Sequence, residues 1–223
     1  MKALVFDAYG TLFDVLSVTS LCELLFPGSG AALATTWRSK QLQYSLLRSL
    51  MERYVDFWQI TQDALVYSTR ALSLDLTAEK RDRLMDAYRT LHAFPDAKPG
   101  LEQLKAKGLR LAILSNGAPE MLQSAATSAG IRDLLDEIIS VDEVKVFKPS
   151  PRVYHLASTR LGVAVKDIGF VSSNGWDVAG AASTGLTAFW IQRLSAEPPE
   201  ELGYRAAHVV HTITDLVERT SRT

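Results

Sequence analysis

Short apolar runs and longer amphipathic segments alternate along this chain, and the first apolar run is the clearest. Residues 3–6, Ala-Leu-Val-Phe, stop at a carboxylate, Asp7. A short apolar run with β-branched and aromatic residues predicts a strand that is buried on both faces. Gly10 allows a tight turn directly after it. Ligands of open α/β sheets bind beyond the carboxyl ends of the strands, so Asp7 is placed where a nucleophile would lie.

The segment from residue 15 to about residue 95 carries a helical pattern throughout. Apolar residues recur at helical spacing on one face, for example at Leu46, Leu50 and Tyr54. Thr77 precedes a polar run and is a preferred residue at the start of a helix. We therefore expect a group of helices inserted directly after the first strand and its turn.

From Phe94 onward, predicted strands alternate with predicted helices. The strands are expected at 109–114, 137–141, 168–172, 187–191 and 207–210. The helices are expected at 99–107, 119–130, from Pro151 onward with Ser150 as the cap, and at 179–183. Strands that alternate with helices predict a parallel, doubly wound sheet.

The expected fold class is therefore α/β, with a Rossmann-like doubly wound parallel sheet and an inserted helical subdomain. The core domain is predicted to comprise residues 1–13 and 96–223, and the helical cap subdomain residues 14–95. A chain of 223 residues is long enough for one such domain with its insert.

Composition narrows the setting in which the protein works. Hydrophobic residues make up 47% and the formal net charge is −1, so bulk charge favours neither nucleic acid nor anionic lipid as a partner. Cys22 is the only cysteine, so no intrachain disulfide can form, as in proteins of reducing compartments. We see no cleavable signal pattern and no apolar run long enough to span a bilayer. These features predict a cytoplasmic protein.

Polar side chains follow several of the predicted strands. The set consists of Asp7, Ser115, Lys148, Ser172, Asn174 and Asp177. Because the carboxyl ends of parallel strands share one edge of the sheet, we expect these side chains to converge on one pocket. Each also has a purely structural interpretation: Asp7 would bind turn amides, Asp177 would cap a helix, and Lys148 would be solvated.

These stretches resemble the motifs of the haloacid dehalogenase superfamily, and within it the L-2-haloacid dehalogenases. The resemblance covers the whole chain and is carried by DAYGTLFD (7–14), WRSKQLQYSLLRS (37–49), LSNG (114–117), KVFKPSPRVY (145–154) and SSNGWD (172–177). Two positions depart from patterns in the superfamily. Phosphatases carry a second Asp at the position of Tyr9, and Ser39 stands where the dehalogenases usually have another residue, which concerns substrate fit.

The resemblance implies a role for each matching residue. The implied catalytic residues are Asp7, Thr11, Lys148, Ser172, Asn174 and Asp177. The implied substrate-binding residues are Arg38, Phe57, Ser115, Asn116, Tyr154 and Trp176. Arg38 and Asn116 would cradle the halide and Phe57 would form an apolar wall. No metal and no cofactor are implied, and His92, His155, His208 and His211 receive no role.

The implied reaction has two steps. Asp7 attacks C2 of an L-2-haloalkanoic acid, expels halide and forms an aspartyl ester, with Lys148 favouring the ionised carboxylate. Water activated by Asp177 then hydrolyses the ester to a D-2-hydroxy acid. Halide leaves as a weak base, so the reaction tolerates Tyr9 in place of the acid that a phosphatase needs.

Two other functions stay open at this stage, together with the oligomeric state. One alternative is a Mg²⁺-dependent small-molecule phosphatase of the same superfamily, and the other is a catalytically inactive binding relative. Leu42, Leu46 and Leu50 on the predicted insert suggest a homodimer face, a hypothesis that rests on helical periodicity and on the resemblance. The alternative is that these leucines pack within the insert.

Overall fold

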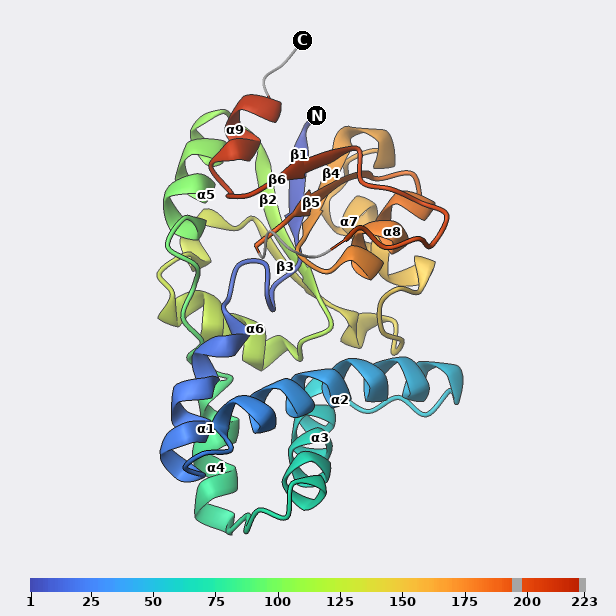
Figure 1. Cartoon of the computed structure of the whole chain (residues 1–223). Helices are drawn as coiled ribbons and strands as arrows, with labels where there is room; N and C mark the ends of the chain where they lie inside the picture. The colour runs from blue at the N-terminus through green and yellow to red at the C-terminus, as the bar shows by residue number, and fades with distance from the viewer. Residues whose placement is uncertain (194–197, 221–223) are drawn as a thin grey trace.

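A parallel six-stranded sheet forms the centre of the molecule (Figure 1), as a computed structural model describes it for residues 1–193 and 198–220. The predicted core domain, 96–223 in its second part, includes residues 194–197 and 221–223, which lie outside the described residues. The strands lie in the order β3-β2-β1-β4-β5-β6, and every pairing is parallel. Their bounds are β1 Ala3–Phe6, β2 Arg110–Ser115, β3 Glu137–Ser140, β4 Ile168–Ser172, β5 Thr187–Ile191 and β6 His208–Val210. The predicted α/β fold class is confirmed.

The first strand lies in the middle of this sheet, which explains its unbroken apolar sequence. β1 pairs with β2 on one side and β4 on the other, and all four of its residues are buried. Phe6 lies level with Ile113 and Val171, and the amide of Asp7 donates to the carbonyl of Val171 over 2.9 Å. The chain therefore leaves the sheet at Asp7, beside the ends of the two neighbouring strands.

Helices cover both faces of the sheet, with α5 and α6 on one face and α7 and α8 on the other (Figure 1). Their bounds are α5 Ala97–Ala106, α6 Pro119–Ser128, α7 Pro151–Leu161, α8 Gly175–Ser183 and α9 Asp215–Arg219, with short 3-10 helices η2 Arg132–Leu134, η3 Val141–Glu143 and η4 Val165–Asp167. Among residues 1–193 and 198–220, no helix combines the length and the apolar character needed to cross a bilayer.

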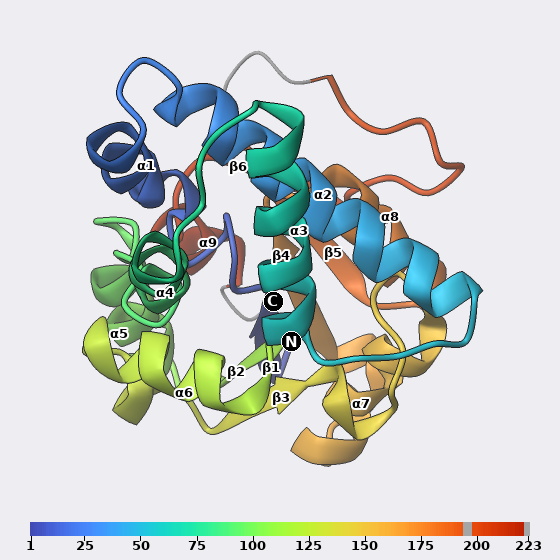
Figure 2. The same ribbon diagram turned by 90° about the horizontal axis from the view of Figure 1, so that it is seen from below.

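The remaining helices lie beyond the carboxyl ends of the strands, on the side away from the N-terminus and α9 (Figures 1 and 2). We call α1 to α4 the cap helices; their bounds are α1 Thr19–Leu25, α2 Gly30–Leu50, α3 Phe57–Ala71 and α4 Ala78–Ala87, preceded by η1 Val15–Val18. Thr77 caps α4 as expected, because its Oγ1 accepts from the amide of Lys80 over 3.3 Å. The helical character of the insert is thus confirmed, and α2 ends four residues before Tyr54.

Two neighbouring segments connect the cap helices to the sheet. The amide of Asp14 donates to the carbonyl of His92 over 2.8 Å, and that of Phe94 to the carbonyl of Leu12 over 2.9 Å. Phe13 and Ala93 form an antiparallel bridge between these contacts. We call residues 12–14 and 92–94 the linker pair. Because its two segments are bonded to each other, they form one joint between the cap helices and the sheet.

Two helix starts differ from the sequence prediction. α8 begins at Gly175 rather than at Ala179, and α5 begins at Ala97 rather than at Pro99. The run of small residues marks only the later part of α8, while its first turn carries the polar residues of the site. Asp177 consequently lies in that first turn. The predicted strands differ from the observed ones by one residue at some ends.

Candidate active site

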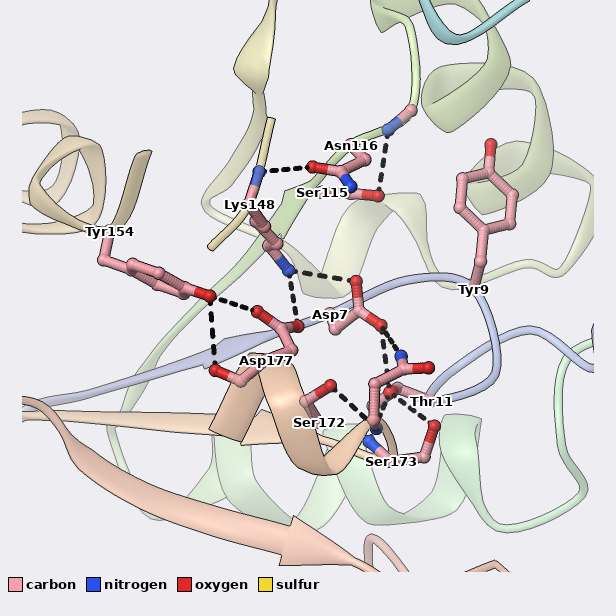
Figure 3. Close-up of polar contacts among 12 residues, drawn as sticks. Asp7, Tyr9, Thr11, Ser115, Asn116, Lys148, Tyr154, Ser172, Ser173 and Asp177 are labelled. Atoms are coloured by element: carbon pink, nitrogen blue, oxygen red, sulfur yellow. Dashed lines mark hydrogen bonds and ion pairs between the residues drawn. The ribbon is translucent and has the colours of Figure 1, made fainter. Parts of the chain in front are cut away.

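A buried lysine lies between two buried carboxylates at the carboxyl edge of the sheet (Figure 3). The Nζ of Lys148 is 3.0 Å from Oδ1 of Asp7 and 2.9 Å from Oδ2 of Asp177. The side chains of Lys148, Asp7 and Asp177 are 1%, 9% and 0% exposed. Buried charges are tolerated when they are paired and hydrogen-bonded, and this cluster meets both conditions while carrying one more negative than positive charge.

Each member of this cluster comes from a different part of the chain. Asp7 follows β1, Asp177 projects from α8, and Lys148 lies in the loop before α7. The amide of Lys148 donates to Oδ1 of Asn116 over 3.0 Å, which ties this loop to the end of β2. Asn174, not Asp177, holds the capping position of α8. The carboxylate of Asp177 is thus directed at Lys148, and Lys148 is not solvated.

Burial and charge act in opposite directions on these groups. Burial raises the pKa of Asp177 above its ordinary value, and the nearby ammonium of Lys148 opposes that rise only in part. Burial by itself would lower the pKa of Lys148, but the carboxylates of Asp177 and Asp7 outweigh it and the pKa is raised. Lys148 therefore stays a cation, and Asp177 is a stronger proton acceptor than an exposed aspartate.

The second oxygen of Asp7 is held by its own set of donors. Oδ2 accepts from Nδ2 of Asn174 over 3.0 Å and from Oγ1 of Thr11 over 3.3 Å. The hydroxyl of Thr11 is fixed in turn, because Oγ1 accepts from the amide of Ser173 over 2.9 Å. Ser172 acts one step further away: its Oγ accepts from the amide of Asn174 over 3.1 Å. Both oxygens of the Asp7 carboxylate are thus oriented.

Tyr154 lies in a different place from the one expected. Its hydroxyl donates to Oδ1 of Asp177 over 2.7 Å, and it is not among the residues that line the active-site cavity. The ring packs edge-on against Phe170, 5.6 Å between centroids, which directs the hydroxyl at the back of Asp177. Gly180 permits this approach, since a Cβ there would lie 2.4 Å from the hydroxyl oxygen. Tyr154 is placed to position Asp177 rather than to contact substrate.

The carboxylate of Asp7 opens on a small cavity of about 10 Å³ between the sheet and the cap helices. It brings together most of the predicted substrate-binding residues with residues that the prediction did not include. The lining is Asp7, Tyr9, Arg38, Leu42, Phe57, Ser115, Asn116, Asn174 and Trp176. A cavity of this size holds about one water molecule. A larger ligand therefore enters only when the surrounding side chains or the cap helices move.

Two lining residues were missed as site residues in the sequence. Tyr9 was noted in the sequence only because it stands where a phosphatase has its acid. It is 2% exposed, and its ring stacks on Phe57 with 5.8 Å between centroids. Burial raises the pKa of Tyr9, which stays neutral. Leu42 was proposed for an exposed dimer face, but it lines the cavity one helical turn after Arg38. That spacing was the signal for Leu42, because residues four apart share a helix face.

The donor set of this site does not fit a divalent cation. Mg²⁺ requires a nearly octahedral set of oxygen ligands. Here the ammonium of Lys148 lies between Asp7 and Asp177, so the gap between the two carboxylates is filled by a cation of the chain itself. In the described part of the chain, no three His, Cys, Asp or Glu side chains gather closely enough to hold a metal.

The chain belongs to the haloacid dehalogenase-like hydrolases, whose family model matches residues 1–185. Within that class it is 47% identical over 218 residues to an (S)-2-haloacid dehalogenase of Pseudomonas sp. (strain YL), covering 98% of this chain and 94% of that protein. Its fold is similar to that of the L-2-haloacid dehalogenase RSc1362, with a TM-score of 0.96, 47% identity and coverage of 100% and 99%. It is also similar to the L-2-haloacid dehalogenase from Xanthobacter autotrophicus with chloropropionic acid covalently bound, with a TM-score of 0.93, 41% identity and full coverage of both chains.

Proposed function

We propose that this chain is a hydrolytic dehalogenase that converts L-2-haloacids into D-2-hydroxy acids and halide through an ester of Asp7. The observation that carries the proposal is the placement of Lys148 between two buried carboxylates, of which only Asp7 lines the cavity. A relative at 47% identity is an (S)-2-haloacid dehalogenase, and one similar structure holds chloropropionic acid covalently. The reaction needs no metal.

In the first step, a carboxylate oxygen of Asp7 attacks C2 of the substrate opposite the carbon–halogen bond. The new C–O bond forms as the halide leaves with the bonding electrons, which inverts the carbon. Arg38 and Asn116 line the cavity and supply a cation and an amide for the departing halide. Ser115 lies in the same lining, where its hydroxyl can bind the substrate carboxylate. A halide needs no proton to leave, so Tyr9 need not be an acid.

In the second step, Asp177 removes a proton from a water molecule that attacks the ester carbonyl carbon of Asp7. The acyl C–O bond then breaks, and the alkoxide takes up the proton held by Asp177. Asp7 keeps one oxygen from water, and its carboxylate is restored when the second proton of that water is released to solvent. The raised pKa of Asp177 suits it to this task, because a general base works best when its pKa lies near the operating pH. Tyr154 holds Asp177 in place, and Asn174 lies beside Asp7 where it can orient the water.

The test is halide release from L-2-chloropropionate by the purified protein in the presence of a metal chelator. In a single turnover in ¹⁸O-water, the label should appear in the Asp7 carboxylate rather than directly in the product. No halide release, together with turnover of a phosphate ester only when Mg²⁺ is added, would refute the proposal and support the phosphatase alternative. No turnover of either substrate class would support the inactive binding relative.

The division of the chain into a core domain, 1–13 and 96–223, and a cap subdomain, 14–95, is part of the proposal. The cap helices supply Arg38, Leu42 and Phe57 to the cavity, while the remaining lining comes from the core. Because the cavity is too small for a haloacid, we infer that the cap helices move relative to the sheet during turnover. We expect substrate to change the rate of hydrogen exchange at the amides of the linker pair. Unchanged rates would contradict the inferred movement of the cap helices relative to the sheet.

We also propose that the protein is a homodimer that associates through the end of α2. The side chains of Leu46, Leu47, Leu50 and Met51 are 45%, 42%, 74% and 58% exposed. Contiguous exposed apolar residues mark association surfaces. Light scattering should give the mass of a dimer, and Leu50→Glu should give that of a monomer with turnover retained. A monomeric wild-type protein would refute this association.

The cytoplasmic location stays a prediction within this proposal. It rests on the single cysteine, Cys22, which is buried, and on the reducing compartments in which such chains are common. Fractionation of the source cells tests it, and dehalogenase activity in a secreted fraction would contradict it.

A further inference from the structure

Arg193 lies directly beyond β5, at the same edge of the sheet as the active site. Its Nη2 donates to the backbone carbonyl of Thr11 over 2.7 Å, and its Nη1 lies 2.7 Å from Oδ1 of Asp96. The guanidinium also stacks over the ring of Phe94, with Cζ 4.1 Å from the centroid. One side chain thus contacts two segments that are distant in sequence, the turn at Thr11 and residues 94–96.

The three residues that Arg193 contacts belong to different parts of the fold. Thr11 belongs to the turn that follows the nucleophile, Phe94 belongs to the linker pair, and Asp96 precedes α5. Asp96 is itself anchored to the core, because its Oδ2 accepts from the amide of Ile213 over 2.6 Å. The side chains of Arg193 and Asp96 are only 13% and 18% exposed, so solvent screens their ion pair less than a surface pair.

The contact with Thr11 reaches the nucleophile in one step. The hydroxyl of Thr11 lies 3.3 Å from Oδ2 of Asp7 and accepts from the amide of Ser173 over 2.9 Å. A shift of the Thr11 peptide would therefore move a group that orients the attacking carboxylate. Movement of the cap helices would strain this same peptide, because Leu12 in the linker pair follows Thr11 directly.

We propose that Arg193 is a positioning residue for the first chemical step: it fixes the turn of Thr11 to the core while the linker pair bends. In-line displacement at carbon requires the attacking oxygen to be held in a narrow range of positions, and small misplacements are costly. Arg193 does not line the cavity, and its link to the nucleophile runs through Thr11. The inference rests on the proposed dehalogenase activity.

The experiment compares Arg193→Met, which removes both polar contacts but keeps much of the stem, with Arg193→Lys, which can reach one acceptor at a time. Arg160→Met is the matched control, because Arg160 forms two ion pairs with Glu137 and Glu143 at the surface. Halide release is followed in a single turnover with enzyme in excess. We expect Arg193→Met to slow this step by about 10- to 100-fold, Arg193→Lys to fall between, and the control to be unchanged.

A double-mutant cycle with Thr11→Val separates positioning from general structural damage. If Arg193 acts through Thr11, then Arg193→Met should slow halide release far less in the Thr11→Val background than in the wild type. Equal effects in the two backgrounds, or an unchanged rate in Arg193→Met, would overturn the inference. Where Arg193→Met does not fold, Arg193→Lys takes its place in the cycle.

Hydrogen exchange separates this inference from the proposed function, since it needs no turnover. Amides of residues 8–14 should exchange faster in Arg193→Met than in Arg160→Met, and the ester hydrolysis rate should change less than halide release. Unchanged exchange in that segment would overturn the inference even if the wild type is a dehalogenase. A wild-type protein that releases no halide would refute the proposed function. If exchange is nevertheless faster in Arg193→Met, Arg193 anchors the turn but has no part in a dehalogenase reaction, and the inference is overturned.

Discussion

The two sides of the active-site cavity are built from different chemistry. The core side presents Asp7, whose two oxygens are bonded to Lys148, Asn174 and Thr11. The cap side presents two apolar side chains, Leu42 and Phe57, and one cation, Arg38. The core thus supplies groups that are oriented before substrate arrives, while the cap supplies the wall that closes over it.

The difference explains how a charged nucleophile can work on a small organic acid. Ion pairs and hydrogen bonds that are held in place before the reaction need no reorganisation during it. Apolar side chains around the site strengthen these interactions, because electrostatic interactions are stronger in a medium of low dielectric constant. On this basis, changes to Asp7 and the groups that hold it should affect the chemical steps, and changes to the apolar residues of the cap side should affect substrate binding. The following substitutions test that division.

Asp7→Asn should have the largest effect. An amide is a poor nucleophile, so turnover should fall by more than about 1000-fold, as it does when other covalent nucleophiles are removed. Halide release from L-2-chloropropionate measures this, and intact-mass analysis checks that the amide has not been hydrolysed back to a carboxylate. Asp14→Asn, at the start of η1, is the control. Unchanged turnover with an intact amide would remove Asp7 as the nucleophile.

Lys148→Met should be next, with a fall in turnover of about 100- to 1000-fold, comparable to the loss of an electrostatic stabiliser. It leaves Asp7 and Asp177 buried without their cation, which should lower the free energy of unfolding by about 3–5 kcal/mol at neutral pH. The opposing ammonium is gone, so the pKa of folded Asp177 rises further above its unfolded value. Stability from such a group is present at low pH and is lost as the pH rises through the folded pKa.

The stability defect of Lys148→Met should therefore be smaller in mildly acidic buffer than at neutral pH. Urea unfolding at the two pH values measures it. Lys105→Met is the control, because Lys105 pairs with Asp136 at the surface. A defect that grows on acidification would contradict the expected protonation of buried Asp177.

Tyr154→Phe should have a smaller effect that appears in the pH profile. The hydroxyl of Tyr154 stabilises the ionised form of Asp177 and so lowers its pKa. Without this hydroxyl, the acidic limb of the pH profile for ester hydrolysis should move to higher pH. The rate of ester hydrolysis at neutral pH should fall by about 10-fold. Tyr204→Phe, at an exposed position, is the control. A uniform loss without a shift would mean that Tyr154 does not act through Asp177.

Phe57→Ala should have the smallest effect on the chemical steps, because it changes only the cap wall. Phe57 is 1% exposed and packs on Tyr9 and Phe147, so the substitution should cost about 3–5 kcal/mol of stability. The KM for L-2-chloropropionate should rise, while halide release in a single saturated turnover should change little. Tyr67→Ala on the exposed face of α3 is the control. A loss of single-turnover rate as large as that of Lys148→Met would break the comparison.

The sequence by itself determined the sheet, the inserted helices and the set of polar residues at the strand ends. An apolar run as short as residues 3–6 favours a buried strand over a helix, and a turn such as that at Gly10 follows from local geometry. Parallel strands then bring Asp7, Lys148 and Asp177 to one edge whatever their separation in the chain. The motif stretches added the roles that the resemblance implies for those residues.

Only the tertiary structure decided where the side chains of that set point. Tyr154 was predicted to contact substrate and lies behind Asp177, because its ring is fixed by Phe170. Leu42 lines the cavity, because α2 presents to the core the face that carries Arg38. Helical periodicity defines a face, but which neighbour covers it depends on packing between segments that are distant in sequence.

Arg193 shows the same limit most clearly. Nothing in its local sequence signals a contact with Thr11, which lies 182 positions earlier. The contact arises because β5 and β1 both end at the carboxyl edge of the sheet, where the first turn and the linker pair also lie. Local patterns determine elements, whereas side-chain partners across such a separation are set by how the elements pack.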